Sequence, residues 1–294
     1  MIDLQKKFDY DFGYLRGMAT FEMAEKYFEV KQYGVAVRLY RKSLNYFFPT
    51  AVKTNRTDRV LRNKDLVENS DKSVIEAFLK RNVEIENTAK FIEARFRFLI
   101  EENNVEAMLG LADLLYILKV REKYMGIDEI TYRFFCRGRN LEEEAANEVY
   151  EERISLYERA ANKNVLEALL YLGRVYKKQN NYNKAKEYYE KAANLNNAEA
   201  AYELACIIDD GCLLYAPTWG PVEFNEEEKQ IIDKCVKLYF KAAYLGNTKA
   251  MSVISYCYEV GVGVEKDEQR SKQWEEVKKI YTAHFVEDNM HNLK

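Results

Sequence analysis

The sequence has few of the residues that interrupt regular backbone structure. Only 3 prolines and 12 glycines occur among its 294 residues, whereas these two residues together usually make up roughly 12% of a protein. All-β folds depend on turns that are rich in both residues, so their scarcity argues against such a fold and favours helices. With 48% apolar and 32% charged residues, the composition also excludes a wholly disordered chain.

Long apolar runs are absent too. No window of about 18 residues is apolar and uncharged, so we expect no membrane insertion. The first turns of the chain carry charges such as Asp3, Lys6 and Lys7, with no apolar run typical of a secretory signal. The 5 cysteines are odd in number and irregularly spaced, which is typical of reduced thiols. These features predict a cytoplasmic protein.

Catalytic and metal-binding signatures are missing. The 2 histidines, His284 and His291, have no cysteine at the spacing of a metal site, and no Walker, HExxH, GxSxG or kinase motif occurs. Gly261-Val262-Gly263 lacks the Lys-Ser/Thr of a phosphate loop, so we interpret it as a turn between helices. The sequence predicts no enzyme, no cofactor and no metal, although Asp209-Asp210 and the Arg133–Arg139 cluster keep an enzymatic alternative open.

Positive charge is not in excess, since the net charge is −3. This excludes a globally basic protein and makes a nucleic-acid partner an unfavoured hypothesis. Two local basic clusters, Lys53–Lys64 and Arg133–Arg139, could contact phosphates or an acidic partner. We interpret the first as a solvated loop and the second as an insertion that packs its own Phe134-Phe135 pair.

The sequence does contain an internal repeat. Four segments align on Ala107, Ala168, Ala200 and Ala250. Eleven residues before these anchors stand the aromatics Phe96, Tyr157, Tyr189 and Tyr239, and four residues before them stand Asn103, Asn164, Asn196 and Gly246. Small and apolar residues recur at helical spacing, and Asn and Gly tolerate the left-handed conformation that ends a helix. Each unit is therefore predicted to be an antiparallel helical hairpin.

A weaker unit lies near the N-terminus. The residues Ala24, Tyr27, Ala36, Tyr40 and Ser43 stand at the same offsets as Gly173, Tyr176, Ala185, Tyr189 and Ala192. Agreement at five points in two independent segments makes chance an inadequate explanation, so a further hairpin is predicted there.

These residues carry a resemblance to known repeats. The pattern from Gly173 to Ala192 resembles a tetratricopeptide repeat. The segment 250–274, whose turn runs from Gly261 to Asp267 and is followed by Trp274, resembles a Sel1-like repeat. The resemblance implies an all-α fold, an α-solenoid of antiparallel helical hairpins that forms a Sel1-like and TPR-like superhelix. Only the last unit keeps the full glycine turn, and two units carry insertions.

The predicted organisation has four parts. They are an N-terminal TPR-like hairpin at 1–48, a polar basic loop or linker at 49–72, a Sel1-like array at 73–285 with insertions near 119–140 and 211–225, and a frayed tail at 286–294. Asn140 and Asn225 precede acidic residues in the pattern of a capping box, so we expect a helix to restart after each insertion.

The resemblance also implies a function, because arrays of this kind often serve as scaffolds or adaptors. In such arrays the first helices of successive hairpins line a concave face. The resemblance places the following residues on that face: Leu109, Asp113, Tyr116, Leu170, Arg174, Lys177, Tyr202, Cys206, Asp209, Ser252, Tyr256 and Glu259. This mixture of aromatics and both charge signs suits a peptide or protein partner. We expect Arg174 and Lys177, beside Asp209, to orient the bound segment.

The second insertion supports an alternative. It is apolar and contains Pro217 and Pro221, and it either covers the helix ends of its own array or presents Tyr215 and Trp219 to a partner. In the second case the protein could instead be a stoichiometric inhibitor or toxin-neutralising effector that acts through its insertion loops.

Overall fold

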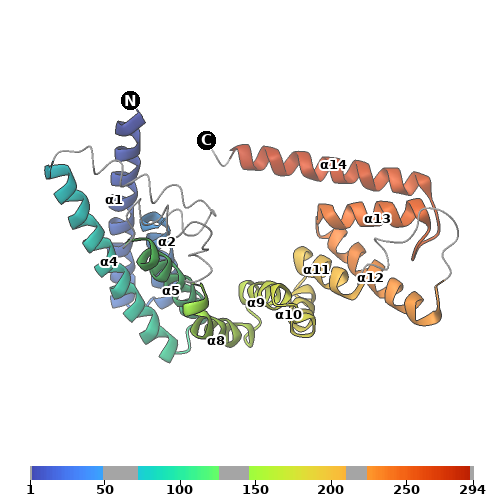
Figure 1. Cartoon of the computed structure of the whole chain (residues 1–294), viewed down its shortest axis with the longest axis horizontal. Helices are drawn as coiled ribbons and strands as arrows, with labels where there is room; N and C mark the ends of the chain where they lie inside the picture. Colours follow the sequence, from blue (N-terminus) through green and yellow to red (C-terminus); the bar gives the residue numbers. More distant parts are fainter. Residues whose placement is uncertain (1, 49–71, 126–145, 210–223, 292–294) are drawn as a thin grey trace, which may run out of the picture. The chain divides into compact units, whose positions relative to one another are not determined.

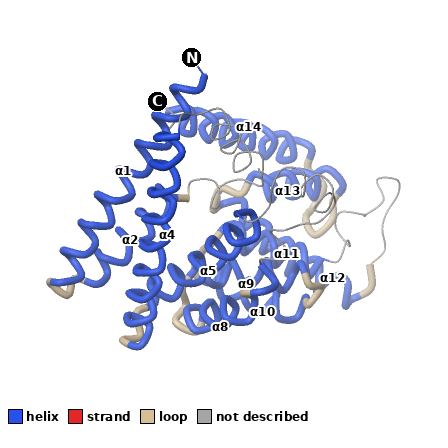
Figure 2. Tube along the Cα trace, turned by 60° about the vertical axis from the view of Figure 1, so that its left-hand side comes forward, coloured by secondary structure: helices blue, strands red, loops and turns tan. Residues whose placement is uncertain are grey.

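The computed structural model describes residues 2–48, 72–125, 146–209 and 224–291. These ranges contain helices and short turns and no strand (Figures 1 and 2). The all-α fold expected from the scarcity of proline and glycine is thus confirmed. The chain divides into two compact units, Met1–Lys163 and Asn164–Lys294, which we call unit 1 and unit 2.

Unit 1 begins with the predicted N-terminal hairpin. Its described helices are α1 (Ile2–Glu29), α2 (Tyr33–Phe47), α4 (Lys72–Glu101), α5 (Val105–Met125) and α8 (Tyr150–Ala161). The hairpin α1/α2 packs through α2 on both α4 and α5, and α8 packs on α5. The N-terminal hairpin therefore belongs to one unit with the helices that follow it, which differs from the boundaries at 48 and 72 drawn from the sequence.

Unit 2 is a succession of hairpins in which each helix packs on the next. Its described helices are α9 (Leu166–Lys178), α10 (Tyr182–Asn194), α11 (Ala198–Asp209), α12 (Glu226–Tyr244), α13 (Thr248–Val260) and α14 (Glu268–His291). Helix α14 continues to His291, although the sequence suggested a frayed tail from residue 286. The linker 49–72 and the inner parts of both insertions fall almost entirely outside the described residues.

The short turns between hairpins have the conformation expected from their asparagines. Asn103, Asn164 and Asn196 have φ values of 63°, 58° and 58°, and Gly246 has 94°. The left-handed residue ends one helix, and the next residue begins another. Asn197 shows this directly, because its side-chain oxygen accepts the backbone N–H of Ala200 at 2.8 Å. Two adjacent residues thus end and start helices, so the hairpins follow one another closely.

The start of α12 and the turn between α13 and α14 also have the predicted local structure. Asn225 and Glu228 form the expected capping box, with both side chain-to-backbone distances at 2.9 Å. Gly261 and Gly263 have φ values of 81° and 71° in the turn between α13 and α14, and the Asp267 carboxylate accepts the backbone N–H groups of the first turn of α14. The glycine segment is therefore an interhelical turn, as predicted. Asn140 lies outside the described residues.

A buried aromatic recurs on helices α2, α4, α8, α10 and α12. Tyr40, Phe96, Tyr157, Tyr189 and Tyr239 are all at most 3% exposed. Tyr189 of α10 lies against Gly173 of α9, where a Cβ atom would come within 2.7 Å of its ring. The glycine lets the two helices approach closely enough for the ring to fill the space between them.

This close approach makes Gly173 a sensitive position. Gly173→Ala should lower the free energy of unfolding by about 1–3 kcal/mol, because the buried Tyr189 ring has no room to move away. Gly34→Ala is the matched control, since a Cβ there meets nothing within 4 Å and alanine favours a helix by up to about 1 kcal/mol. Urea unfolding measures both changes. Equal stability of the two variants would contradict this account of the hairpin.

Candidate functional site

The charged residues expected to orient a bound segment are already paired within unit 2. The Arg174 guanidinium on α9 donates two hydrogen bonds of 3.0 Å to the Glu199 carboxylate on α11. Lys177, one turn further along α9, forms an ion pair with Glu203 of α11. These two pairs join the first helices of adjacent hairpins, so within the described residues Arg174 and Lys177 pair with the neighbouring helix α11 through Glu199 and Glu203 and not with Asp209.

Asp209 was expected on the open face of the array, but it is buried, with only 1% of its surface exposed. It lies at the end of α11, close to Tyr239 of α12 and Cys257 of α13. Burial raises the pKa of the Cys257 thiol to about 12, and the Asp209 carboxylate contributes in the same direction. A carboxylate so enclosed cannot face a partner.

In unit 1 the predicted residues are taken up by internal contacts. Leu109 is 3% exposed and belongs to the core, because α2, α4 and α8 all pack on α5. The Asp113 carboxylate pairs with Arg41 at 3.1 Å and accepts the hydroxyl of Tyr157 at 2.9 Å. The ring of Tyr116 lies 4.8 Å from the guanidinium carbon of Arg153. These residues hold helices together.

Three remaining predicted residues of unit 2 are half-buried. Leu170 lies on α9, and Tyr202 and Cys206 lie on α11. The centres of the Tyr202 and Tyr239 rings lie 5.9 Å apart. The Lys249 ammonium nitrogen lies 5.9 Å from the centre of the Tyr202 ring. The Tyr239 hydroxyl donates to the Cys206 sulfur at 3.6 Å. These side chains pack between helices more than they face solvent.

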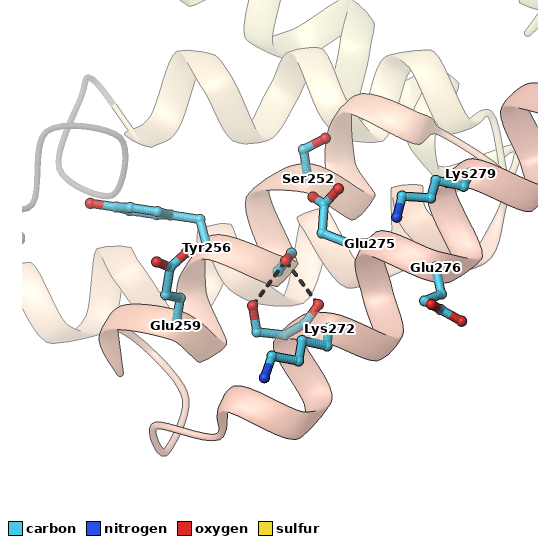
Figure 3. Close-up of a pocket in the computed structure, with 9 residues that line it drawn as sticks. Ser252, Tyr256, Glu259, Lys272, Glu275, Glu276 and Lys279 are labelled. Carbon is cyan, nitrogen blue, oxygen red and sulfur yellow. Dashed lines mark hydrogen bonds between the residues drawn. The ribbon is translucent and has the colours of Figure 1, made fainter.

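The structure does bring Ser252, Tyr256 and Glu259 together in a cleft of about 410 Å³ between α13 and α14 (Figure 3). All the residues that line this cleft come from these two helices; the others are Ser255, Ser271, Lys272, Glu275, Glu276 and Lys279. The cleft is the candidate functional site.

The floor of the cleft is a pair of buried serines. The Ser255 hydroxyl of α13 donates to the backbone oxygen of Ser271 of α14 at 2.9 Å, and the two hydroxyl oxygens lie 3.1 Å apart. Ser255 is 4% and Ser271 is 9% exposed. This contact fixes the spacing of the two helices below the charged rim.

The rim carries both signs of charge. Glu259 and Lys272 lie toward one end of the cleft, and Lys279 lies toward the other (Figure 3). Glu275 pairs with Lys278 of the same helix at 2.9 Å. Within the described part of the chain, neither Glu259, Lys272, Glu276 nor Lys279 forms an ion pair, so these four charges are available to a ligand.

The contribution of α14 to the cleft was missed in the sequence. Its residues Ser271, Glu275 and Lys279 recur at intervals of four, with Lys272 and Glu276 beside them, which places all five on one helix face. A polar face of this kind is ordinarily solvated, so only its position opposite Ser252, Tyr256 and Glu259 reveals the cleft.

The predictions on the second insertion fall on residues outside the described ranges. They concern Tyr215 and Trp219, and both interpretations of that insertion remain predictions. Among the residues that the structure covers, no three side chains of His, Cys, Asp or Glu are placed to hold a metal ion. The covered helices include none that is apolar over the length needed to cross a membrane.

Comparison with known families agrees with the repeat seen in unit 2. The tetratricopeptide repeat model matches residues 166–199, and the Sel1 repeat model matches residues 229–247 and 248–274. The chain carries both kinds of repeat. Sel1 and tetratricopeptide repeats generally mediate protein–protein interactions and are typically non-catalytic.

Solved structures with similarity to the chain include two Sel1-like proteins. One is a Sel1 repeat protein from Oxalobacter formigenes, with 21% identity over 69% of each chain and a TM-score of 0.39. The other is c5321, a protective antigen of uropathogenic Escherichia coli with an SLR fold. It has 20% identity and a TM-score of 0.40; the match covers 88% of the present chain and 52% of that protein, about half its length. No curated protein matches the sequence.

The ion pairs between repeats lead to a stability prediction. Arg174→Glu with Lys177→Glu should lower the free energy of unfolding by about 1–2 kcal/mol, because two partly exposed pairs become repulsive. Adding Glu199→Lys and Glu203→Lys should recover most of this loss, since it restores both pairs with the signs exchanged. Thermal unfolding of the three forms measures the coupling. A double variant as stable as the original chain would show that the pairs contribute nothing.

The burial of Cys257 leads to a prediction on reactivity. A thiol with a pKa of about 12 is ionised about a thousandfold less than one with the ordinary pKa of 9.0. Alkylation of Cys257 by iodoacetamide near pH 8, followed by peptide mass mapping, should therefore be at least a thousandfold slower in the folded than in the urea-unfolded protein. Because the pKa is higher in the folded state, ionisation of this thiol should also lower stability as the pH rises from about 9 towards 12. Comparable alkylation in both states would contradict the burial of the thiol.

Proposed function

We propose that the protein is a non-enzymatic interaction scaffold that binds a protein or peptide segment in the cleft between α13 and α14. The observation that carries the proposal is the meeting of Ser252, Tyr256 and Glu259 with the charged face of α14. The repeats themselves favour protein partners, and no cofactor is needed for this role.

The chemistry of the cleft suits a polypeptide ligand. Tyr256 offers a half-buried aromatic surface with a polar end, which is typical of residues that anchor interfaces. Lys272 and Lys279 can pair with carboxylates, and Glu259 and Glu276 can pair with basic side chains. A segment with charges of both signs would therefore be held in one orientation.

The rest of the predicted face supports a narrower role. Arg174 and Lys177 are occupied by Glu199 and Glu203, so a partner would have to break those pairs to use them. We therefore propose that binding centres on the last hairpin. The free thiols of Cys206, Cys235 and Cys257 fit a reducing, cytoplasmic setting.

Capture from a lysate of the source cells tests the proposal. The double variant Tyr256→Ala/Glu259→Lys should recover a specific partner at least about tenfold less than the original chain, because it removes the aromatic anchor and reverses a rim charge. Quantitative mass spectrometry of the captured proteins provides the measurement.

The control is Tyr182→Ala/Glu187→Lys, which makes the same two changes at exposed positions of α10. It should capture the partner as the original chain does, and both variants should melt within a few degrees of it. If both variants capture the same proteins in the same amounts, the cleft is not the binding site.

A further inference from the structure

Within unit 2, each hairpin is covered by the first helix of the next. Helix α11 lies on the hairpin α9/α10, joined to α9 by the Arg174–Glu199 and Lys177–Glu203 pairs and packed along α10. It begins beside the end of α10, where the Asn196 and Asn197 N–H groups donate to Ala193 and Ala192. The hairpin α11/α12 is followed in the same way by α13, which packs on α12.

The cleft occupies the equivalent position on the last hairpin. When Ala250 is aligned with Ala168, the cleft residues Ser255, Tyr256 and Glu259 correspond to Gly173, Arg174 and Lys177. Counting from the first residues of α14 and α10, Ser271, Glu275 and Lys279 correspond to Ala185, Tyr189 and Ala193.

A contact that recurs between hairpins supports this alignment. In α11/α12 the Cys235 sulfur lies 3.8 Å from the backbone oxygen of Ala205. The aligned residues of α13/α14 are Ser271 and Ser255, which form the hydrogen bonds at the floor of the cleft. The same pair of positions therefore meets in both hairpins.

The aligned residues differ in chemistry. In α9/α10 the positions under α11 include Gly173, Ala185 and Tyr189, all buried. In α13/α14 they are Ser255, Ser271 and Glu275, and the described residues place no third helix on them. The last hairpin α13/α14 thus keeps the surface that receives a helix in α9/α10, but polar and charged side chains line it.

We propose that the cleft receives an amphipathic helix from a partner protein, seated on α13/α14 as α11 is seated on α9/α10. This inference rests on the proposed function and adds the form and chemistry of the ligand. The helix runs parallel to α13, with its first turn near Lys279 and its later turns near Glu259, because α11 begins near Ala193 and reaches Lys177 through Glu203.

The charges of the cleft define the ligand further. Lys177 pairs with an acidic residue of α11, but the aligned residue of the cleft is Glu259, which requires a basic one. At the other end, Lys279 stands where α10 has Ala193, so an acidic residue in the first turn of the ligand is favoured by Lys279 and by the helix dipole. The ligand is thus a helix with an acidic residue in its first turn and a Lys or Arg about one turn later, as Glu203 follows Glu199 in α11.

A peptide derived from α11 serves as the probe. It spans residues 197–209 with Cys206→Ala, and a lactam bridge joins positions 201 and 205, which lie on the opposite side of the helix from Glu199 and Glu203. The bridge is needed because an isolated helix of this length is marginal in water. One version keeps Glu203, and the second carries Glu203→Lys. Fluorescence anisotropy measures the binding of both to the full chain.

The full chain should bind the Glu203→Lys peptide about threefold to fivefold more tightly than the unmodified one, the size expected for one exposed charge pair. The Glu259→Lys chain should reverse this preference, and the control Glu187→Lys, on α10, should leave it unchanged. Amide chemical shifts that move on binding should map to α13 and α14.

Three results would overturn the inference. The first is no saturable binding of either peptide up to about 1 mM; the polar face would then only cap the array. The second is binding that does not respond to Glu259→Lys. The third is self-association of the chain in sedimentation that Glu259→Lys abolishes, since a second copy would then be the occupant. A partner captured through the cleft that nevertheless binds as an extended segment would remove the helix inference and leave the proposed function standing.

Discussion

Close packing of a large ring between helices organises both units. Tyr189 shows how it works: its ring fills the space that Gly173 leaves open, and burial raises the pKa of its hydroxyl. In unit 1, Phe96 lies against Gly110 of α5 in a similar way, where a Cβ atom would come within 2.7 Å of the ring. A ring of this size needs helices on more than one side to be excluded from water. A hairpin that carries such a ring, as α9/α10 does, is therefore completed by the helix that follows it.

The features that were predicted from the sequence are those that depend on nearby residues. Asn196 must adopt positive φ because two helices meet there within a few residues, and few other residues tolerate that conformation. The capping box of Asn225 and Glu228 and the glycine turn after α13 are equally local. The spacing of residues in the sequence was sufficient to predict these turns and caps, because the geometry of each depends on only a few neighbouring residues.

The features that could not be predicted depend on which side of a helix its neighbours cover. Leu109 and Asp209 occupy positions that the repeat pattern assigns to an open face, yet helices packed around α5 and at the end of α11 bury both. The pairs of Arg174 and Lys177 with Glu199 and Glu203 could not be predicted for the same reason, since the spacing along α9 does not show which residues of α11 lie opposite. Glu275 replaces the recurring aromatic, but its significance becomes visible only when α13 lies beside it.

The order in which helices pack has a consequence for how the protein unfolds. In unit 2 the large contacts join helices that are neighbours in the sequence, such as α9 with α10 and α12 with α13. Contacts of this kind close short loops, which favours fast folding that spreads from one hairpin to the next. They also allow a terminal hairpin to open while the interior stays folded. A segment bound against α14 would therefore hold the last hairpin closed and slow its opening. Binding in the cleft would then make this hairpin more rigid while changing its shape little.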